Sequence, residues 1–286
     1  MTNVAASLAE IQADAPVADA NAGAQIHPHG AYHVETVLWV RHWTEAYFSF
    51  AITRPASFRF RSGEFVMIGL PGEKKPIVRA YSIASPAFAE ELEFFSIKVA
   101  DGPLTSRLQK IQPGDQILLA KKPTGTLVLD ALKPGKRLWL IGTGTGLAPW
   151  LAVARDPDAY ERFGRVIIAH TVRETKDLAY RDLFEREIHE DPLVGDQARE
   201  QFSYYPTVTR EPFAHPGRIT DRLRSGEAFR DLGLEQDRFN PEEDRVMICG
   251  SMAMIKEAAT LLEAQGLVEG SNAEPGDFVI ERAFVG

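Results

Sequence analysis

The sequence of 286 residues has little of what several functional classes require. Cys249 is its only cysteine, which rules out an internal disulfide and a protein-bound iron–sulfur cluster, because such a cluster needs about four cysteine ligands. We therefore expect a reducing, cytoplasmic compartment. No apolar run reaches the roughly 18 residues of a membrane span. No basic block accompanies the net charge of -8, so we expect neither a membrane nor a nucleic-acid partner.

The beginning of the chain lacks the features of a targeting segment. Residues 1–24 contain no aromatic side chain and no arginine, which argues against a signal peptide and a mitochondrial transit peptide. We expect residues 1–30 to form a mobile extension. His27, His29 and His33 form a local cluster, but no cysteine or carboxylate pair supports a metal site there. We therefore predict no metal.

The residue pattern changes near residues 132–136. Before this point, short β-rich runs alternate with Gly, Pro and Asp turns and one helix, which favours an antiparallel β-barrel. After it, apolar strands alternate with helices, as in an α/β parallel sheet covered on both faces. We expect domains at 31–133 and 134–286. The expected strands cover 34–40, 47–52, 65–70, 92–99, 116–120, 137–141, 165–170, 202–208 and 245–250, and the expected helices 103–110, 147–154, 180–190 and 251–265.

The tetrapeptide Arg79-Ala80-Tyr81-Ser82 points to a flavin. It combines a fixed positive charge, a flat ring and a hydroxyl at the end of a strand. A flavin needs a cation for its pyrophosphate, a face for its ring system and a hydrogen-bond partner near N5, the atom that accepts hydride. For the tetrapeptide alone, the alternative is a surface arginine beside a core tyrosine.

A second segment strengthens the flavin interpretation. In Gly102-Pro103-Leu104-Thr105-Ser106, Thr105 and Ser106 stand at the expected start of a helix. Free backbone N–H groups and the helix dipole favour phosphate at such a position.

The run from Ile141 to Pro149 predicts a dinucleotide site. Gly142 and Gly144 fit the first two glycines of the G-x-G-x-x-G pattern, whereas Leu147 occupies the third. The run lies between an apolar strand and a helix, a junction that presents backbone N–H groups to a pyrophosphate.

In their order, Arg79-Ala80-Tyr81-Ser82, Gly142-Thr143-Gly144-Thr145-Gly146 and Cys249-Gly250-Ser251 resemble the ferredoxin–NADP(+) reductase family, and most closely its bacterial type. The resemblance covers about 31–286. It implies an FAD-containing barrel, a Rossmann-like NADP-binding domain and a monomeric enzyme. The enzyme would exchange a hydride with NADPH and single electrons with ferredoxin or flavodoxin. Two alternatives stay open: an NAD(P)H reductase component for an oxygenase or haem protein, and a non-catalytic flavin- or dinucleotide-binding sensor subunit.

The resemblance also implies roles for individual residues. For FAD it implies Arg79, Ala80, Tyr81, Ser82, Ile97, Lys98, Val99, Leu104, Thr105, Ser106, Thr145, Ala283 and Phe284. For NADP it implies Gly144, Arg173, Thr209, Arg210, Arg218, Cys249, Gly250, Ser251 and Met252. Ser82, Cys249 and Glu281 are the catalytic candidates, with Cys249 lining the nicotinamide pocket rather than acting as a nucleophile.

Three arginines predict NADP rather than NAD. Arg173, Arg210 and Arg218 follow expected strand ends and could enclose a 2′-phosphate through charge-assisted pairs; solvated surface charge is the alternative for each. Glu174 weakens this interpretation, because an acid in this region favours the 2′-hydroxyl of NAD.

The last residues depart from the plant-type pattern of the family. Ala283 stands where those members have an aromatic residue two positions after a glutamate, here Glu281. Phe284 is then the candidate to stack on the flavin adenine. What covers the outer face of the flavin is left open. Glu281 either assists proton balance near N5 or is a solvated carboxylate at a strand end.

Overall fold

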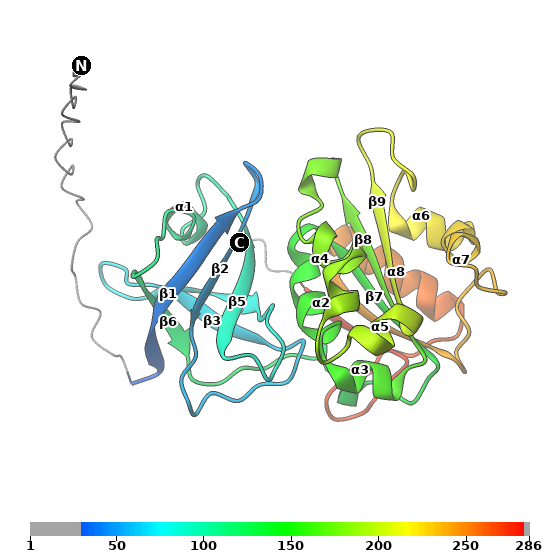
Figure 1. The fold of residues 1–286 in the computed structure, drawn as a ribbon, viewed down its shortest axis with the longest axis horizontal. Helices are drawn as coiled ribbons and strands as arrows, with labels where there is room; N and C mark the ends of the chain where they lie inside the picture. Colours follow the sequence, from blue (N-terminus) through cyan, green and yellow to red (C-terminus); the bar gives the residue numbers. More distant parts are fainter. Residues whose placement is uncertain (1–29, 283–286) are drawn as a thin grey trace, which may run out of the picture.

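The computed structural model describes residues 30–282, in which two β-sheets lie side by side (Figure 1). The first sheet is antiparallel, with the strand order β4-β3-β6-β1-β2-β5. A bridge between Ile83 and Phe94 links its two edge regions, so the sheet curls into a nearly closed barrel. Its strands are β1 (Tyr32–His42), β2 (Tyr47–Thr53), β3 (Phe65–Leu70), β4 (Ile77–Ser82), β5 (Glu91–Ile97) and β6 (Gln116–Ala120).

Strands β2 and β5 are buried on both faces, which explains their continuous apolar character. Phe48, Phe50 and Ile52 pack in the barrel core. Tyr47 lies on the opposite face of β2 from these three residues. Together with Phe95 of β5, it belongs to a cluster shared with the second sheet. Alternate side chains of a strand point to opposite faces, so the second sheet with its helices covers the outer face of these two strands.

The second sheet is parallel, with the order β11-β10-β7-β8-β9. The chain runs outward from the central β7 to β8 and β9, then returns to β10 on the other side. In such sheets a ligand-binding crevice forms at the carboxyl ends of the strands where the direction reverses, here between β7 and β10. The strands are β7 (Arg137–Thr143), β8 (Arg165–Val172), β9 (Phe202–Val208), β10 (Asp244–Gly250) and β11 (Phe278–Arg282).

Helices cover both faces of the parallel sheet, as the alternating pattern predicts (Figure 1). One face carries α2 (Ala148–Val153), α3 (Pro157–Arg162), α4 (Arg181–Glu185), η4 (Glu187–Glu190) and α5 (Gly195–Gln201). The other carries α6 (Ile219–Arg224), α7 (Glu227–Asp231) and α8 (Met252–Ala264). The remaining short elements are α1 (Thr105–Leu108), η1 (Leu129–Ala131), η2 (Gly144–Leu147) and η3 (Thr175–Asp177).

The structure differs from the expected elements in two ways: one helix is split and several short elements are additional. The single helix expected over 180–190 is split into α4 and η4, because Arg186 leaves helical geometry at φ -135°. Strand β11 and the helices α3, α5, α6 and α7 were not predicted. Each of these five has five to seven residues, too few for a clear periodicity.

Two features are absent from residues 30–282, a membrane-spanning helix and a metal-ligand cluster. None of the helices there is long and apolar enough to cross a membrane. No group of three or more potential metal ligands occurs in the same range, and the predicted histidine cluster falls mostly on His27 and His29, outside the described residues.

Candidate functional site

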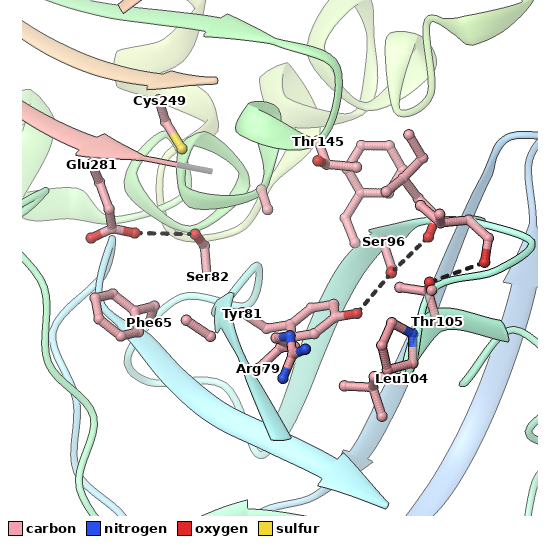
Figure 2. Close-up of a pocket in the computed structure, with 17 residues that line it drawn as sticks. Phe65, Arg79, Tyr81, Ser82, Ser96, Leu104, Thr105, Thr145, Cys249 and Glu281 are labelled. Carbon is pink, nitrogen blue, oxygen red and sulfur yellow. Dashed lines mark hydrogen bonds between the residues drawn. The ribbon is translucent and has the colours of Figure 1, made fainter. Parts of the chain in front are cut away.

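A pocket opens where the two sheets meet (Figure 2). The barrel contributes the end of β4, the end of β5 and the loop before α1. The parallel sheet contributes η2 and the carboxyl ends of β10 and β11. The pocket is lined by Phe65, Arg79, Ala80, Tyr81, Ser82, Phe95, Ser96, Ile97, Val99, Gly102, Pro103, Leu104, Thr105, Thr145, Ala148, Cys249 and Glu281.

Tyr81 presents a fixed, neutral ring to this pocket. Its hydroxyl lies 3.2 Å from the hydroxyl of Ser96, and its ring meets Phe94 edge-on, with centroids 6.4 Å apart. Burial raises the pKa of Tyr81 above its ordinary value. A ring held in this way offers a flat apolar face to a planar ligand.

Arg79 places a positive charge in the pocket without an acidic partner. Its Nη1 donates to the carbonyl of Val78 at 2.9 Å, and no carboxylate within residues 30–282 forms an ion pair with it. Because a guanidinium presents several donors in a plane, most of its capacity remains for an anionic ligand. This donor set fits a pyrophosphate.

The loop before α1 offers a ligand fewer free backbone N–H groups than the sequence suggests. Thr105 Oγ1 donates to the carbonyl of Val99 at 3.2 Å, and Leu104 is buried beneath the pocket. The prediction of a free N–H at Ser106 is wrong, because that N–H donates to the Gly102 carbonyl at 3.1 Å. The carbonyls of Gly102 and Leu104, just before the four-residue helix α1, accept from the N–H groups of Ser106, Arg107 and Leu108.

Lys98 turns away from the pocket. Its Nζ donates to the carbonyl of Thr44 at 2.8 Å, and its N–H donates to the carbonyl of Ala46 at 2.7 Å. Both donors of Lys98 therefore hold the turn between β1 and β2, while Ile97 and Val99 on either side of it line the pocket.

Ser82, Cys249 and Glu281 come together from three strands, as Figure 2 shows. Ser82 Oγ donates to Glu281 Oε1 at 3.4 Å. Burial raises the pKa of Glu281 to about 8, against the lowering effects of the Ser82 hydroxyl and the Thr126 backbone N–H. Burial also raises the pKa of the Cys249 thiol. At neutral pH the group therefore consists of a protonated carboxyl, a thiol and a hydroxyl.

The glycine loop packs directly against the end of β10. A Cβ on Gly146 would lie 2.2 Å from the carbonyl oxygen of Cys249, and one on Gly142 would lie 2.7 Å from Nε1 of Trp150. Gly144 adopts a left-handed φ of 53°, which glycine tolerates without strain. The sequence of glycines is therefore a requirement of close packing at the switch point between β7 and β10.

His170 on β8 contacts this loop through a hydrogen bond. Its Nε2 lies 3.0 Å from the carbonyl oxygen of Gly144, and since a carbonyl only accepts, Nε2 carries the proton. Burial lowers the pKa of His170 to about 4, so the ring stays neutral. His170 was not predicted from the sequence, because a histidine in a buried strand belongs to no recognisable motif.

The predicted 2′-phosphate residues share one edge of the parallel sheet. The Arg210 N–H donates to the carbonyl of Arg173 at 2.9 Å, and the Thr209 N–H donates to that of Val172 at 3.2 Å. Arg173, Thr209 and Arg210 are exposed. Glu174, which weakened the NADP interpretation, is paired with Lys176 through an oxygen–nitrogen distance of 2.6 Å.

Arg218 lies at the same edge but already has a partner. It precedes α6, next to Gly217, whose N–H donates to the carbonyl of Val208 at 2.8 Å. Its Nη1 lies 3.4 Å from Oε1 of Glu257 on α8. Because Arg218 is exposed, this pair is weak and leaves the guanidinium accessible.

The remaining NADP candidates follow β10. Ser251 caps α8 by accepting from the Met254 N–H at 3.4 Å, and its own N–H donates to Thr143 Oγ1 at 3.0 Å. A Cβ on Gly250 would lie 2.3 Å from that same oxygen. Met252 is 52% exposed and lines a neighbouring groove rather than the pocket.

Several pocket residues were not predicted. Phe65, Phe95, Ser96 and Ala148 line the pocket but belong to ordinary strand and helix sequences. Conversely, Ala283 and Phe284 lie outside the described residues, so the predictions for them stay predictions.

A barrel with an unpaired arginine and a fixed tyrosine, joined to the switch point of a parallel sheet, defines a flavin- and pyridine-nucleotide-dependent oxidoreductase. Residues 40–129 match the family described as "Oxidoreductase FAD-binding domain", and residues 140–260 match "Oxidoreductase NAD-binding domain". Full-length relatives narrow this class. The flavodoxin/ferredoxin–NADP reductase of Rhodobacter capsulatus is 57% identical over 253 residues, which are 88% of this chain and 93% of the relative.

Two further comparisons agree. The ferredoxin–NADP reductase of Pseudomonas aeruginosa is 53% identical over 254 residues, which are 88% of this chain and 98% of the relative. The crystal structure of a ferredoxin NADP+ reductase from Neisseria gonorrhoeae with bound FAD and NADP matches with a TM-score of 0.80 and 33% identity, covering 90% of this chain and 100% of that chain. This protein therefore belongs to the ferredoxin/flavodoxin–NADP reductase family, which confirms the family and the fold class predicted from the three motifs.

Proposed function

We propose that this protein uses FAD to exchange a hydride with NADP(H) and single electrons with ferredoxin or flavodoxin. The observation that carries the proposal is the composition of the pocket. Arg79 and Tyr81 come from the barrel, and Cys249 and Glu281 come from the parallel sheet. A flavin against the first pair and a nicotinamide against the second would meet at Ser82.

The barrel residues would hold FAD. Arg79 would pair with the pyrophosphate, Tyr81 would support the ring system, and the loop at Leu104 and Thr105 would contact the nucleotide. Bound FAD supplies chemistry that no side chain provides, because it accepts electron pairs from NADPH and releases them singly.

The residues of the parallel sheet would orient the nicotinamide and supply a proton. The close approach of Gly146 to β10 shapes the loop for a pyrophosphate, and Cys249 gives the pocket a small, uncharged wall. Glu281 holds a proton next to the Ser82 hydroxyl. With its hydroxyl turned to accept from the protonated Glu281, Ser82 would take up this proton and release its own toward the flavin edge, where reduction creates a need for it.

The exposed arginines would select NADP over NAD. Arg173 and Arg210 are adjacent through a backbone hydrogen bond. Neither forms an ion pair within residues 30–282, although burial raises the pKa of the nearby Asp177 and the charge of Arg173 opposes that rise. A 2′-phosphate between them would gain charge-assisted hydrogen bonds.

Several finer points are part of the same proposal. We place the FAD-binding domain at 31–133 and the NADP-binding domain at 134–286. We propose a monomer, because one chain supplies both walls of the pocket. We propose a cytoplasmic location, because the single cysteine is buried and unpaired and a reducing compartment suits it.

The similarity to flavodoxin/ferredoxin–NADP reductases favours ferredoxin and flavodoxin over the alternative acceptors. The test begins with the purified protein under anaerobic conditions. We expect a yellow protein that NADPH bleaches and that oxidised ferredoxin or flavodoxin restores. Bleaching without restoration by either acceptor would point to a reductase for an oxygenase or haem protein. A yellow protein that NADPH does not bleach would point to a sensor.

A further inference from the structure

Tyr180, just before α4, has an unusual backbone conformation. Its φ of 60° and ψ of 16° place it in the left-handed region, and it is the only non-glycine residue within 30–282 with a positive φ. A bulky residue is rare there, and such strain persists only where the surrounding structure holds it. The contacts of Tyr180 therefore indicate what this conformation is for.

The side chain of Tyr180 crosses from the parallel-sheet half to the barrel. Its hydroxyl donates to Glu93 Oε1 on β5 at 2.7 Å and also bonds the hydroxyl of Ser49 on β2. Since the single phenol proton goes to Glu93, Ser49 donates to Tyr180. Ser49 in turn accepts from Nε1 of Trp43 at 2.8 Å. The chain Trp43, Ser49, Tyr180, Glu93 is thus fully paired and has one direction.

A second residue from the same half converges on Glu93. Arg155, which follows α2, lies with Nη2 3.3 Å from Glu93 Oε2 and donates to the carbonyl of Ala84 at 2.7 Å. Ser49, Glu93 and Tyr180 are all buried. A buried carboxylate requires such partners, so both halves are needed to satisfy it.

The Tyr180 ring also contacts the wall of the pocket. It packs edge-on against Phe95, with centroids 5.4 Å apart, and against Trp43 at 4.5 Å. Phe95 lines the pocket beside Ser96. A movement of Tyr180 would therefore reach the flavin side of the pocket through one intervening side chain.

We propose that Tyr180 is a positioning residue that sets the orientation of the parallel-sheet half on the barrel, and through it the alignment of nicotinamide and flavin. Apolar packing alone would hold the halves together, but directional hydrogen bonds to two barrel strands fix one orientation. The inference rests on the proposed function and deepens it. Tyr180 itself does not line the pocket and acts through Phe95 and Glu93.

The test compares two tyrosine-to-phenylalanine variants of the FAD-loaded protein. Tyr180→Phe removes the hydroxyl that crosses the interface. Tyr160→Phe is the matched control, because the Tyr160 hydroxyl is also buried but donates to the Ala154 carbonyl within its own half at 2.7 Å. The readouts are FAD content, the rate of flavin reduction by NADPH, the KM for NADPH, and the absorbance of the nicotinamide–flavin charge-transfer complex.

We expect Tyr180→Phe to retain FAD and to reduce its flavin about tenfold more slowly with a weaker charge-transfer band, since a misplacement near 1 Å can cost about 100-fold. The KM for NADPH should stay within about twofold of the wild-type value, because the proposed phosphate contacts are remote from Tyr180. A slower rate at an unchanged KM indicates the loss of an interaction that acts in the transition state. Reoxidation of the chemically reduced variant by ferredoxin should match wild type. Tyr160→Phe should keep the wild-type rate and band.

An unchanged rate and band in Tyr180→Phe would overturn the proposal, as would equal losses in both variants. If Tyr180→Phe does not fold, Ser49→Ala replaces it, since this change removes the bonds of Ser49 to Tyr180 and Trp43 and leaves the Tyr180–Glu93 bond. It should slow flavin reduction in the same direction, and a wild-type rate would overturn the proposal. If the wild-type protein is not reduced by NADPH, the proposed function fails instead.

Discussion

Ser82 Oγ donates to Glu281 Oε1 at 3.4 Å, although the two residues are 199 positions apart. The contact joins the end of β4 in the barrel to the end of β11 in the parallel sheet. The other carboxyl oxygen, Oε2, is buried and accepts no hydrogen bond of good geometry within residues 30–282, although the Thr126 N–H is close enough to lower the pKa. The proton of this carboxyl is therefore retained because burial outweighs the neighbouring donors.

The first prediction concerns the pH dependence of stability. The pKa of Glu281 rises from 4.5 to about 8 on folding, so the folded FAD-free protein binds one more proton than the unfolded chain in this window. Stability should therefore be highest below pH 4.5 for this group and decline toward pH 8, by roughly 5 kcal/mol if the whole shift acts. Urea unfolding across this range, with wild type and Glu281→Gln, measures the effect.

The stability of wild type relative to Glu281→Gln should show this decline, because the amide does not titrate and the opposite contribution of the buried, neutral His170 is common to both proteins. Ser82→Ala is the complementary variant: the Ser82 hydroxyl lowers the pKa of Glu281, so its loss should move the decline to higher pH. Identical pH profiles for wild type and Glu281→Gln would show that Glu281 titrates normally in the folded protein.

The second prediction concerns retention of FAD. Arg79 has no acidic partner in the described part of the chain, so Arg79→Ala should lose FAD on dialysis. The loss of one charge-assisted contact is worth about 1.5–3 kcal/mol, or roughly 10- to 150-fold in affinity. Arg59→Ala is the control, since the exposed Arg59 donates to carbonyls of Ala56 and Phe58 in its own loop. Equal retention of FAD by both variants would remove Arg79 from the site.

The third prediction concerns coenzyme choice. Arg210→Ala should raise the KM for NADPH by roughly 10-fold or more and leave the KM for NADH nearly unchanged, because only NADPH carries the 2′-phosphate. The control is Arg224→Ala, whose side chain is exposed and pairs with Asp221 at 2.9 Å on α6. Steady-state kinetics with both coenzymes decides the point, and a parallel loss with NADH would assign Arg210 a structural role.

The fourth prediction concerns the glycine loop. Gly146→Ala would place a Cβ 2.2 Å from the Cys249 carbonyl oxygen, forcing η2 away from the end of β10. We expect a loss of about 1–3 kcal/mol in the free energy of unfolding together with weaker NADP(+) binding. Gly164→Ala serves as the control, because its Cβ would meet only the Lys136 carbonyl oxygen at an ordinary 3.7 Å. Equal stability of the two variants in urea would contradict the packing argument.

Local sequence patterns were sufficient to predict those parts of the fold that depend on residues close together in the chain. Short β-rich runs separated by turn residues predicted the barrel. The continuous apolar strands that alternate with helices predicted the parallel sheet with helices on both faces. The run Gly142-Thr143-Gly144-Thr145-Gly146 predicted the nucleotide loop, because a tight turn between strand and helix requires small residues.

Contacts between distant segments were decided only by the tertiary structure. The occupied N–H of Ser106 and the turn of Lys98 toward Thr44 depend on loop geometry that residue types do not specify. The pairing of Tyr180 with Ser49 and Glu93 has no sequence signal, since each residue is ordinary in its own element.

Glu281 illustrates the division between the two. The sequence by itself determined its place near position 286 and its match to a family position. It could not choose between a solvated carboxylate and a buried proton carrier. The tertiary structure rules out the solvated carboxylate, because strand β11 pairs with β10 and buries the carboxyl against the barrel, where desolvation favours the neutral form.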